Sequence, residues 1–209
     1  MIKKIKRVDA LPFLRAHHYL GGVATSAMIY AHFNSVNQID ALIAFNAPCS
    51  ENVRASILGP EYKQNIIELS RLAIAPDCAL NASQFVSCAI DILIKERKER
   101  NMSEIYCILS FADMTQGHHG GVYQAMSWLY CGESRASAAW RYIDADNNIR
   151  HRRQNGKNIT KKEAIERGWK IETINTKNKH RYIKVIGTKK QKKRIKKQLK
   201  FNILPYPKG

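Results

Sequence analysis

The sequence lacks any apolar stretch long enough to cross a membrane. No segment approaches the roughly 18 consecutive apolar residues that a transmembrane helix needs. The charged segment 1–11 is not followed by an apolar stretch of signal length either. We therefore expect no export, no membrane span and a cytoplasmic protein.

The sequence also lacks paired cysteines. Its five cysteines are an odd number at wide spacing with no CxxC pair, so their pattern gives no indication of a zinc or dithiol redox centre. We expect all of them to be reduced thiols. They are Cys49, Cys78, Cys88, Cys107 and Cys131.

Acidic residues are scarce in the last 60 positions. Residues 1–149 contain 14 basic and 14 acidic side chains, whereas residues 150–209 contain 21 basic and three acidic ones, so this end carries the whole net charge of +18. A basic end on a neutral body favours a phosphate backbone as partner, because each contact releases condensed counterions. A solubility tail or a tail for anionic membranes is the alternative, but no amphipathic aromatic stripe accompanies the lysines. The candidate DNA-contacting residues are Arg152, Arg153, Lys179, Arg181, Lys189, Lys190, Lys192, Lys193, Arg194, Lys196 and Lys197.

With 209 residues the chain is long enough for one sizeable domain and a small appendage. We expect one main domain over residues 1–187, followed by a basic tail over residues 188–209 that forms part of the DNA-binding surface.

The most informative stretch is Glu104–Gly132. Ile105–Phe111 is an apolar run that predicts a strand buried on both faces, and from Val122 the apolar residues recur at helical intervals as far as the Gly132 stop. The turn between them holds polar residues where open α/β sheets bind ligands, namely Asp113, Gln116, His118 and His119. Alternatively, Asp113 merely caps the turn and the histidines are solvated.

Two further segments carry candidate groups. Leu11–Gly22 predicts a helix that begins after Pro12 and ends with His18 and Tyr19 beside a Gly-Gly stop. Ile66–Ile74 predicts a strand whose Arg71 needs an anionic partner: Glu68, Asp113 or a substrate group.

A helix should follow this strand, over about Gln84–Arg97, capped by Asn81 or Ser83. We expect its inner face to contain Phe85, Ala89, Ile92 and Leu93. A strand, helix and strand in this order predict that Ile66–Ile74 and Ile105–Phe111 are parallel neighbours.

The remaining segments predict mostly strands. Hairpins are expected over Ala24–Phe33 with Ile39–Phe45, and over Arg135–Ile143 with Ile149–Arg153. The other predicted elements are a capping box of Thr160 with Glu163, a last strand His180–Ile186, a lysine-rich segment Lys189–Lys200 that becomes helical on DNA, and an extended strap Phe201–Pro207.

Five motifs in order resemble the phage Mom family of DNA-modifying enzymes over nearly the whole chain. They are HHYLGG, ELSRLAI followed by NASQF, FADxxQGHHGGVYQAxxWLY, KHRY and LPYPK. The resemblance implies an α/β (α+β) fold of the GNAT acetyltransferase type, a mixed central sheet flanked by helices with a basic C-terminal extension.

The resemblance implies a transferase that moves a carbamoylmethyl group to N6 of adenine in double-stranded DNA and so protects phage DNA from restriction in the host cytoplasm. The catalytic residues it implies are His18, Tyr19, Arg71, Ser83, Asp113 and Tyr123. It also links the family to iron, with His18, Asp113 and His118 as the matching ligands. The resemblance also implies a small-molecule or carrier-bound group donor. The loop from Pro76 to Ser83 lacks the Gly-x-Gly run with which acyl-coenzyme A transferases bind a pyrophosphate, and this argues against acetyl-coenzyme A as that donor.

Two other functions stay open at this point. The first alternative is a non-catalytic nucleic-acid-binding module, in which Asp113, His18 and Arg71 form a structural ion-pair network. The second is a GNAT acyltransferase for a protein or small amine. The enzyme hypothesis requires that these side chains meet in one cleft facing the cationic end of the chain.

Overall fold

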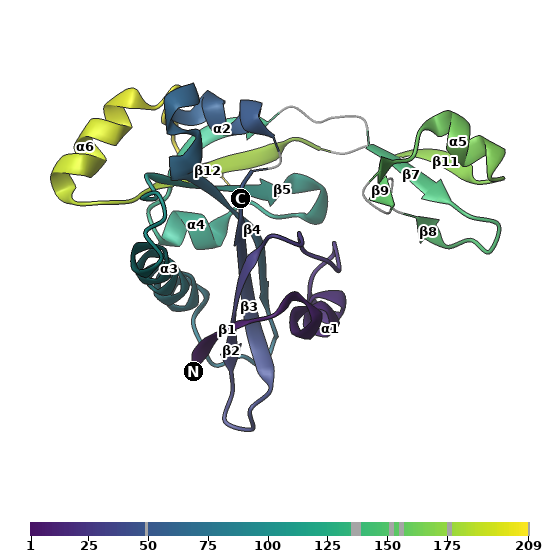
Figure 1. Cartoon of the computed structure of the whole chain (residues 1–209), viewed down its shortest axis with the longest axis horizontal. Helices are drawn as coiled ribbons and strands as arrows, with labels where there is room; N and C mark the ends of the chain where they lie inside the picture. The colour runs from purple at the N-terminus through teal and green to yellow at the C-terminus, as the bar shows by residue number, and fades with distance from the viewer. Residues whose placement is uncertain (49, 135–138, 151–152, 155–156, 175–176, 209) are drawn as a thin grey trace.

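The computed structural model describes residues 1–48, 50–134, 139–150, 153–154, 157–174 and 177–208. Its centre is a seven-stranded sheet in the order β1-β2-β3-β4-β5-β12-β6, shown in Figure 1. The strands are β1 (Ile2–Ile5), β2 (Met28–Phe33), β3 (Ile39–Asn46), β4 (Ile66–Ile74), β5 (Cys107–Asp113), β6 (Leu129–Ser134) and β12 (Lys179–Val185).

Every neighbouring pair in this sheet is antiparallel except β4 and β5, which are parallel. The predicted parallel pair and the predicted β2–β3 hairpin are therefore confirmed. The mixed sheet with flanking helices also confirms the predicted fold class.

Helices pack on both faces of the sheet. The longest, α3, is capped by the Asn81 side chain and buries Phe85, Ala89 and Leu93 in the largest core cluster, as expected, whereas Ile92 is only partly buried. No helix in the described ranges is both long and apolar enough to cross a membrane. The helices that accompany the main sheet are α1 (Arg7–His17), α2 (Glu51–Leu58), α3 (Ala82–Glu99), α4 (Gly121–Ala125) and α6 (Lys189–Gln198), with 3-10 turns η1 (Pro60–Asn65) and η2 (Met114–Gln116).

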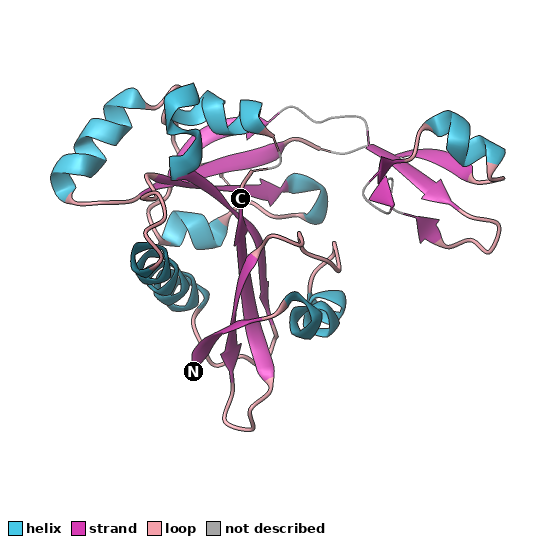
Figure 2. Cartoon of the chain, in the orientation of Figure 1, coloured by secondary structure: helices cyan, strands magenta, loops and turns pink. Residues whose placement is uncertain are grey.

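A second, smaller sheet lies between β6 and β12 along the chain. Its strands are ordered β11-β7-β8, and Tyr142, Ile159 and Ala164 form its own small core. We call residues 139–174 the inserted unit; it stands apart from the main sheet at the right of Figure 2. Its elements are β7 (Ala139–Ile143), β8 (Ile149–Arg150), β9 (Arg153–Gln154), β10 (Lys157–Asn158), α5 (Lys161–Glu166) and β11 (Lys170–Ile174).

The sequence predicted parts of this unit but not the unit itself. The β7–β8 hairpin is confirmed within the described residues, as is the capping box of Thr160 with Glu163. The domain boundary at residues 187 and 188 stays a prediction.

The basic carboxyl-terminal segment packs against the body. Ile195 of α6 is buried in a cluster with residues of β5 and β12, which explains why the segment is helical without DNA. The predicted extended strap is confirmed, because Leu204 N donates to Tyr130 O (2.9 Å) and Tyr206 OH donates to Trp128 O (2.9 Å).

Two helix predictions were wrong. The helix expected from Val122 to Gly132 stops at Ala125, because Leu129, Tyr130 and their neighbours pair with β12 as strand β6. The first helix starts at Arg7 rather than after Pro12, since its buried face already begins at Ala10.

The thiols are free where they can be described. Cys78, Cys88, Cys107 and Cys131 form no disulfide, and Cys49 lies outside the described residues.

Candidate active site

The candidate site lies where the parallel strands β4 and β5 separate. Their ladder joins Ile66–Glu68 to Cys107–Leu109 and extends no further. Beyond it, β4 stays paired with β3 and β5 stays paired with β12. The facing edges of the two strands thus lose their ladder partners, which leaves room and backbone polar groups for a ligand.

Side chains from three distant segments meet at this opening. Tyr19, just after α1, donates its hydroxyl hydrogen to Asp113 Oδ2 at the end of β5 (3.2 Å). The His18 ring stacks on the Tyr19 ring with centroids 4.7 Å apart, and the His118 ring meets Tyr19 edge-on at 6.2 Å. Arg71 of β4 lies close enough to act electrostatically on both His18 and Tyr19.

Arg71 is held in place by main-chain oxygens. Its Nε donates to Gly22 O (2.6 Å), so the Gly-Gly stop after α1 fixes the guanidinium. Burial lowers the pKa of Arg71, and the charges of Tyr19 and Glu68 oppose that shift. The side chain nevertheless stays charged and can receive an anionic group.

Asp113 is an ionised carboxylate with three partners. Besides Tyr19, its Oδ2 accepts the Lys179 ammonium at 2.9 Å and its Oδ1 accepts the Thr115 amide at 3.0 Å. Burial alone would raise the pKa of Asp113, but Lys179 and Thr115 together hold it below the ordinary carboxyl value. Asp113 therefore suits binding and orientation better than proton uptake at neutral pH.

The pKa of Glu68 is shifted in the opposite direction from that of Asp113. Burial raises its pKa to about 7, although the positive charges of Arg71 and Lys179 work against the shift. It also acts electrostatically on Tyr123. From the sequence, Glu68 was expected only as an ion partner of Arg71. The signal that could have identified it is a carboxylate in a strand that consists mainly of Ile, Leu and Ala.

Histidine 18 and Tyr123 are both neutral groups. Burial, followed by the charges of Arg71 and His118, lowers the pKa of His18 to about 4. Burial raises the pKa of Tyr123 to about 12, and its hydroxyl shares a 2.7 Å hydrogen bond with Ser110 Oγ. Tyr123 thus stays protonated inside the core beside the opening.

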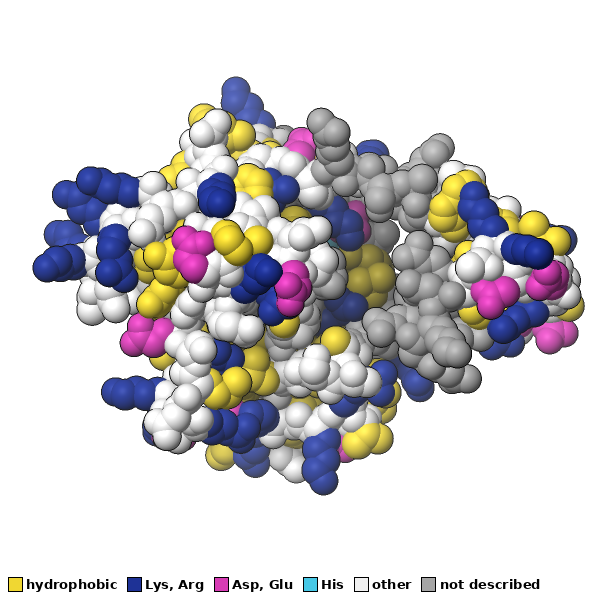
Figure 3. Space-filling model, turned by 45° about the horizontal axis from the view of Figure 1, so that its top comes forward, with side chains coloured by type: hydrophobic (Ala, Val, Ile, Leu, Met, Phe, Trp, Pro, Cys, Tyr) yellow, Lys and Arg dark blue, Asp and Glu magenta, His cyan; other side chains and the backbone are white. Residues whose placement is uncertain are grey.

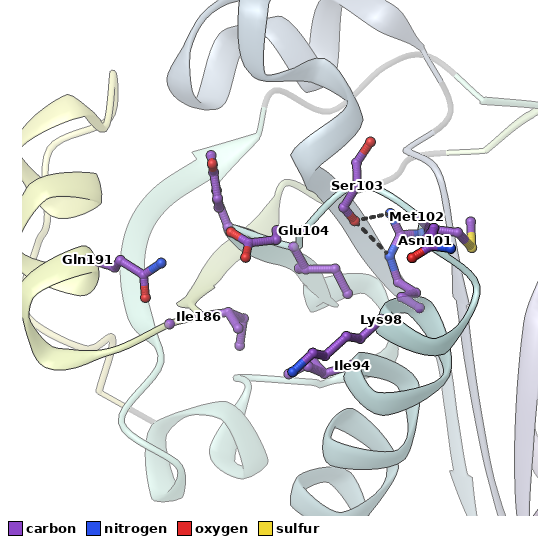
Figure 4. Close-up of a pocket in the computed structure, with 12 residues that line it drawn as sticks. Ile94, Lys98, Asn101, Met102, Ser103, Glu104, Ile186 and Gln191 are labelled. Atoms are coloured by element: carbon purple, nitrogen blue, oxygen red, sulfur yellow. Dashed lines mark hydrogen bonds between the residues drawn. The ribbon is translucent and has the colours of Figure 1, made fainter.

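Two cavities lie near β5. The one beside the cluster measures about 320 Å³ and is lined by ends of β4 and β5 together with His118, Gly120 and Tyr123. A larger one of about 450 Å³ lies at the opposite end of β5, between α3 and α6, where Arg97 donates two hydrogen bonds to Ser103 O (Figure 4). Of the residues predicted as catalytic, Tyr123 lines the smaller cavity and none lines the larger one, so we place the candidate site next to the smaller cavity.

Serine 83 does not join the cluster. Its Oγ donates to Asn81 Oδ1 (2.7 Å) at the start of α3, and it lines a separate hollow with Cys88 and Lys184. Its predicted catalytic role stays a prediction without a contact to the other residues.

The predicted iron ligands do not form a ligand set. In the described part of the chain, the ligand atoms of His18, Asp113 and His118 do not gather within 4.8 Å of one another. The Asp113 carboxylate is also occupied by Lys179. Their geometry therefore does not fit a shared ion.

The predicted DNA-contacting residues fall into three groups. Lys179 and Arg181 make contacts within the chain: Lys179 pairs with Asp113, and Arg181 donates to Cys131 O (3.0 Å) and lies over the Phe201 ring. Arg152 lies outside the described residues, and the backbone of Arg153 belongs to β9. The exposed group is a basic helix surface at the left of Figure 3, formed by Lys189, Lys190, Lys192, Lys193, Arg194, Lys196 and Lys197.

Comparisons with known proteins identify both a family and a fold. The model of the Mom protein family matches residues 1–208. A candidate acetyltransferase from Acinetobacter baylyi ADP1 is similar in structure with a TM-score of 0.51 and 9% identity, covering 89% of this chain and 92% of that one. A GNAT-family acetyltransferase from Streptococcus pneumoniae gives a TM-score of 0.47 and 12% identity, covering 89% and 99%. At such identities the likeness concerns the fold alone. The curated proteins searched contain no match.

Proposed function

The chain belongs to the Mom protein family, and on that premise we propose that it is a DNA-modifying transferase. Its substrate would be adenine in double-stranded DNA, and the transferred group would be of the carbamoylmethyl type, attached to N6. Such a modification protects phage DNA from host restriction enzymes.

The observation that supports this proposal is the convergence of Tyr19, Asp113 and Arg71 at the strand opening. These groups come from three segments of the chain, and two of them are charged. The His118 ring, which meets Tyr19 edge-on, lines a cavity of about 320 Å³, although Tyr19, Asp113 and Arg71 do not line it. Convergent polar groups next to such a cavity are typical of an active site.

Adenine N6 needs help to react, because its lone pair is delocalised into the ring. In the proposed reaction a new N6–carbon bond forms, the donor's leaving group departs with the bonding electrons, and one N6 proton passes to a base. Glu68 has the most suitable pKa for accepting this proton, because burial raises it to about 7. Asp113 would receive a hydrogen bond from the other N6–H or from Tyr19.

Arg71 would hold the anionic part of the donor or stabilise negative charge on the leaving group. Its guanidinium is fixed by Gly22 O and faces His18 and Tyr19. The donor itself stays open, and no step requires iron, because the candidate ligands do not fit a shared ion.

Access to a paired base requires flipping it out of the helix at a cost of a few kcal/mol. Contacts between cations and phosphates would offset this cost. The basic helix surface and the exposed lysines of the inserted unit are the groups available for such contacts.

The decisive experiment is to co-express the chain with a plasmid, digest the plasmid to nucleosides and analyse them by mass spectrometry. We expect a new adenine adduct with the wild-type chain and none with Asp113→Ala. Asp91→Ala, which removes an exposed carboxylate of α3, is the matched control and should leave the adduct unchanged.

The alternatives predict other outcomes. A non-catalytic DNA-binding module would bind DNA but leave all nucleosides unaltered, and Asp113→Ala would lower only its stability. A GNAT acyltransferase for a protein or small amine would bind acetyl-coenzyme A and also leave DNA unaltered.

A further inference from the structure

Three metal-ligating side chains meet outside the candidate active site. His32 lies near the end of β2, Asp40 near the start of β3, and Cys78 in the loop after β4. Their ligand atoms all lie within 4.8 Å of one another, and no other trio of His, Cys, Asp or Glu in the described ranges does so. The His32 Nδ1 and Asp40 Oδ1 atoms are 2.6 Å apart.

The local fold builds this trio from two irregularities. In the β2–β3 ladder His32 faces Ala41 and Phe33 faces Ile39, so Asp40 is an extra residue in a bulge. A bulge redirects the side chain it carries. Asp40 O also accepts the amide of Ala75 (2.8 Å), and a turn from Ala75 to Cys78 (3.1 Å) returns the thiol toward the bulge.

The three side chains are buried to different extents. Asp40 is only 6% exposed, whereas His32 and Cys78 are half-buried. A buried carboxylate needs a polar partner, which here is the His32 imidazole. The Cys78 thiol donates a hydrogen bond to Leu80 O (3.9 Å), which it would give up on binding an ion.

We propose that His32, Asp40 and Cys78 bind a zinc ion. Nitrogen, oxygen and sulfur atoms are all zinc ligands in tetrahedral sites, with ligand distances of about 2.0–2.3 Å, and a water molecule would complete this set. Two such ligands lie about 3.3–3.7 Å apart. The imidazole and carboxylate therefore need to separate by only about 1 Å, and the thiol loses its proton to solvent.

The ion would tie the β2–β3 hairpin to the loop that leads into α3, and so fix the start of the longest helix. The absence of a CxxC pair hid the site from the sequence, because its ligands come from three separate segments.

The test uses the full chain freed of metal by a chelator and titrated with Co²⁺ or Zn²⁺. With Co²⁺ we expect one equivalent to produce thiolate-to-cobalt charge-transfer absorption. Cys78→Ser should abolish that band and lower zinc affinity at least about 100-fold, and His32→Gln should weaken both. Cys88→Ser, a change of an exposed cysteine, is the control and should behave as the wild type.

A second measurement needs no variant and so does not depend on folding of a mutant. One equivalent of Zn²⁺ should protect Cys78 from alkylation in the wild-type chain while Cys88 reacts at the same rate as without metal. The absence of a thiolate band, its persistence in Cys78→Ser, or equal alkylation of Cys78 with and without zinc would each overturn the proposal. None of these readouts depends on DNA modification.

Discussion

Glu68 and Asp113 are two carboxylates at one strand opening with opposite acid–base properties. Burial raises the pKa of Glu68 to about 7, whereas Lys179 and Thr115 outweigh burial at Asp113 and lower its pKa. Pairs of carboxylates whose environments separate their pKa values usually divide the acid–base work between them. Lys179 produces this division, because it pairs directly with Asp113 and acts on Glu68 only from a distance.

The Glu68→Gln variant tests this division. If Glu68 is the base, the variant should lose adenine modification at least about 100-fold, and wild-type activity should rise with pH up to about 7. Glu104→Gln, which changes an exposed carboxyl, should keep both the rate and its pH profile. An active Glu68→Gln enzyme would rule out Glu68 as the base.

Stability gives an independent view of Glu68. A carboxyl whose pKa is raised on folding binds its proton more tightly in the native state, so the protein loses stability as the pH rises from about 4.5 through about 7. Glu68→Gln should therefore match the wild type in unfolding free energy at pH 4 and exceed it above pH 7 by up to about 3 kcal/mol. Urea unfolding at several pH values measures this difference.

His18 should change the unfolding free energy with pH in the opposite direction. Its pKa falls from 6.5 to about 4 on folding, so below pH 6.5 the unfolded chain binds more protons and stability is lost down to about pH 4. His18→Gln should remove this part of the pH dependence. His17→Gln, at the exposed neighbouring ring, is the control and should retain it.

At the level of single residues, the sequence was sufficient to select candidate catalytic side chains but not to predict which side chains contact them. Asp113, His18 and Tyr19 could be selected because polar groups follow a strand or precede a Gly-Gly stop. The role of Lys179 could not be predicted, because it depends on β12 lying beside β5 and facing Asp113. Composition alone assigned Lys179 to DNA.

At the scale of elements, the turn between β5 and α4 depends on Gly120. This residue has φ +81°, and a Cβ atom on it would overlap the Tyr182 ring. Tyr182 cannot easily move, since its hydroxyl donates to His119 O (2.6 Å). Gly120→Ala should therefore destabilise the protein by about 2–3 kcal/mol and disturb the cavity beside His118.

The adjacent glycine supplies the control for this prediction. Gly121 begins α4 with an ordinary backbone conformation, and a Cβ there meets no atom within 4 Å. Gly121→Ala should change stability by no more than about 0.5 kcal/mol. Thermal unfolding of both variants makes the comparison, and equal melting temperatures would refute the proposed role of the turn.

Elements were predictable where local pattern and tertiary pairing agree. The bounds of β4 were predicted correctly, because a nine-residue segment rich in Ile and Leu ends two residues before Pro76. The region after Val122 was predicted as one helix because its apolar spacing suits a helix. Leu129 and the residues after it instead pair with the outer edge of β12 as a strand. A local sequence pattern does not contain information about such long-range pairing.

At the scale of the whole molecule, the basic helix surface lies away from the candidate site. Lys179 at the start of β12 pairs with Asp113, whereas Val185 at its end pairs with Cys107, and α6 follows Val185. Seven strand residues span about 20 Å. The expectation that the cleft faces the cationic end of the chain was therefore wrong for α6.

The segments that flank the inserted unit lie near the candidate site instead. Ser134, the last residue of β6, pairs with Lys179, and Lys177 N donates to Thr115 Oγ1 (3.0 Å) beside Asp113. Figure 1 shows the unit on the side of η2, opposite α6. Its lysines Lys162 and Lys170 are exposed.

These two basic surfaces should therefore act differently on DNA. Lys193→Ala with Lys196→Ala and Lys197→Ala should weaken binding and lower the salt slope by up to about 0.9 per lysine, while saturating DNA restores the modification rate. Lys162→Ala with Lys170→Ala should lower the rate even at saturating DNA, because the inserted unit is joined to the main sheet beside Asp113 and would position the DNA strand that carries the flipped base. Binding measured against salt and modification measured against DNA concentration separate the two effects. Identical behaviour of the two sets would mean that distance from Asp113 does not decide which cations position the base.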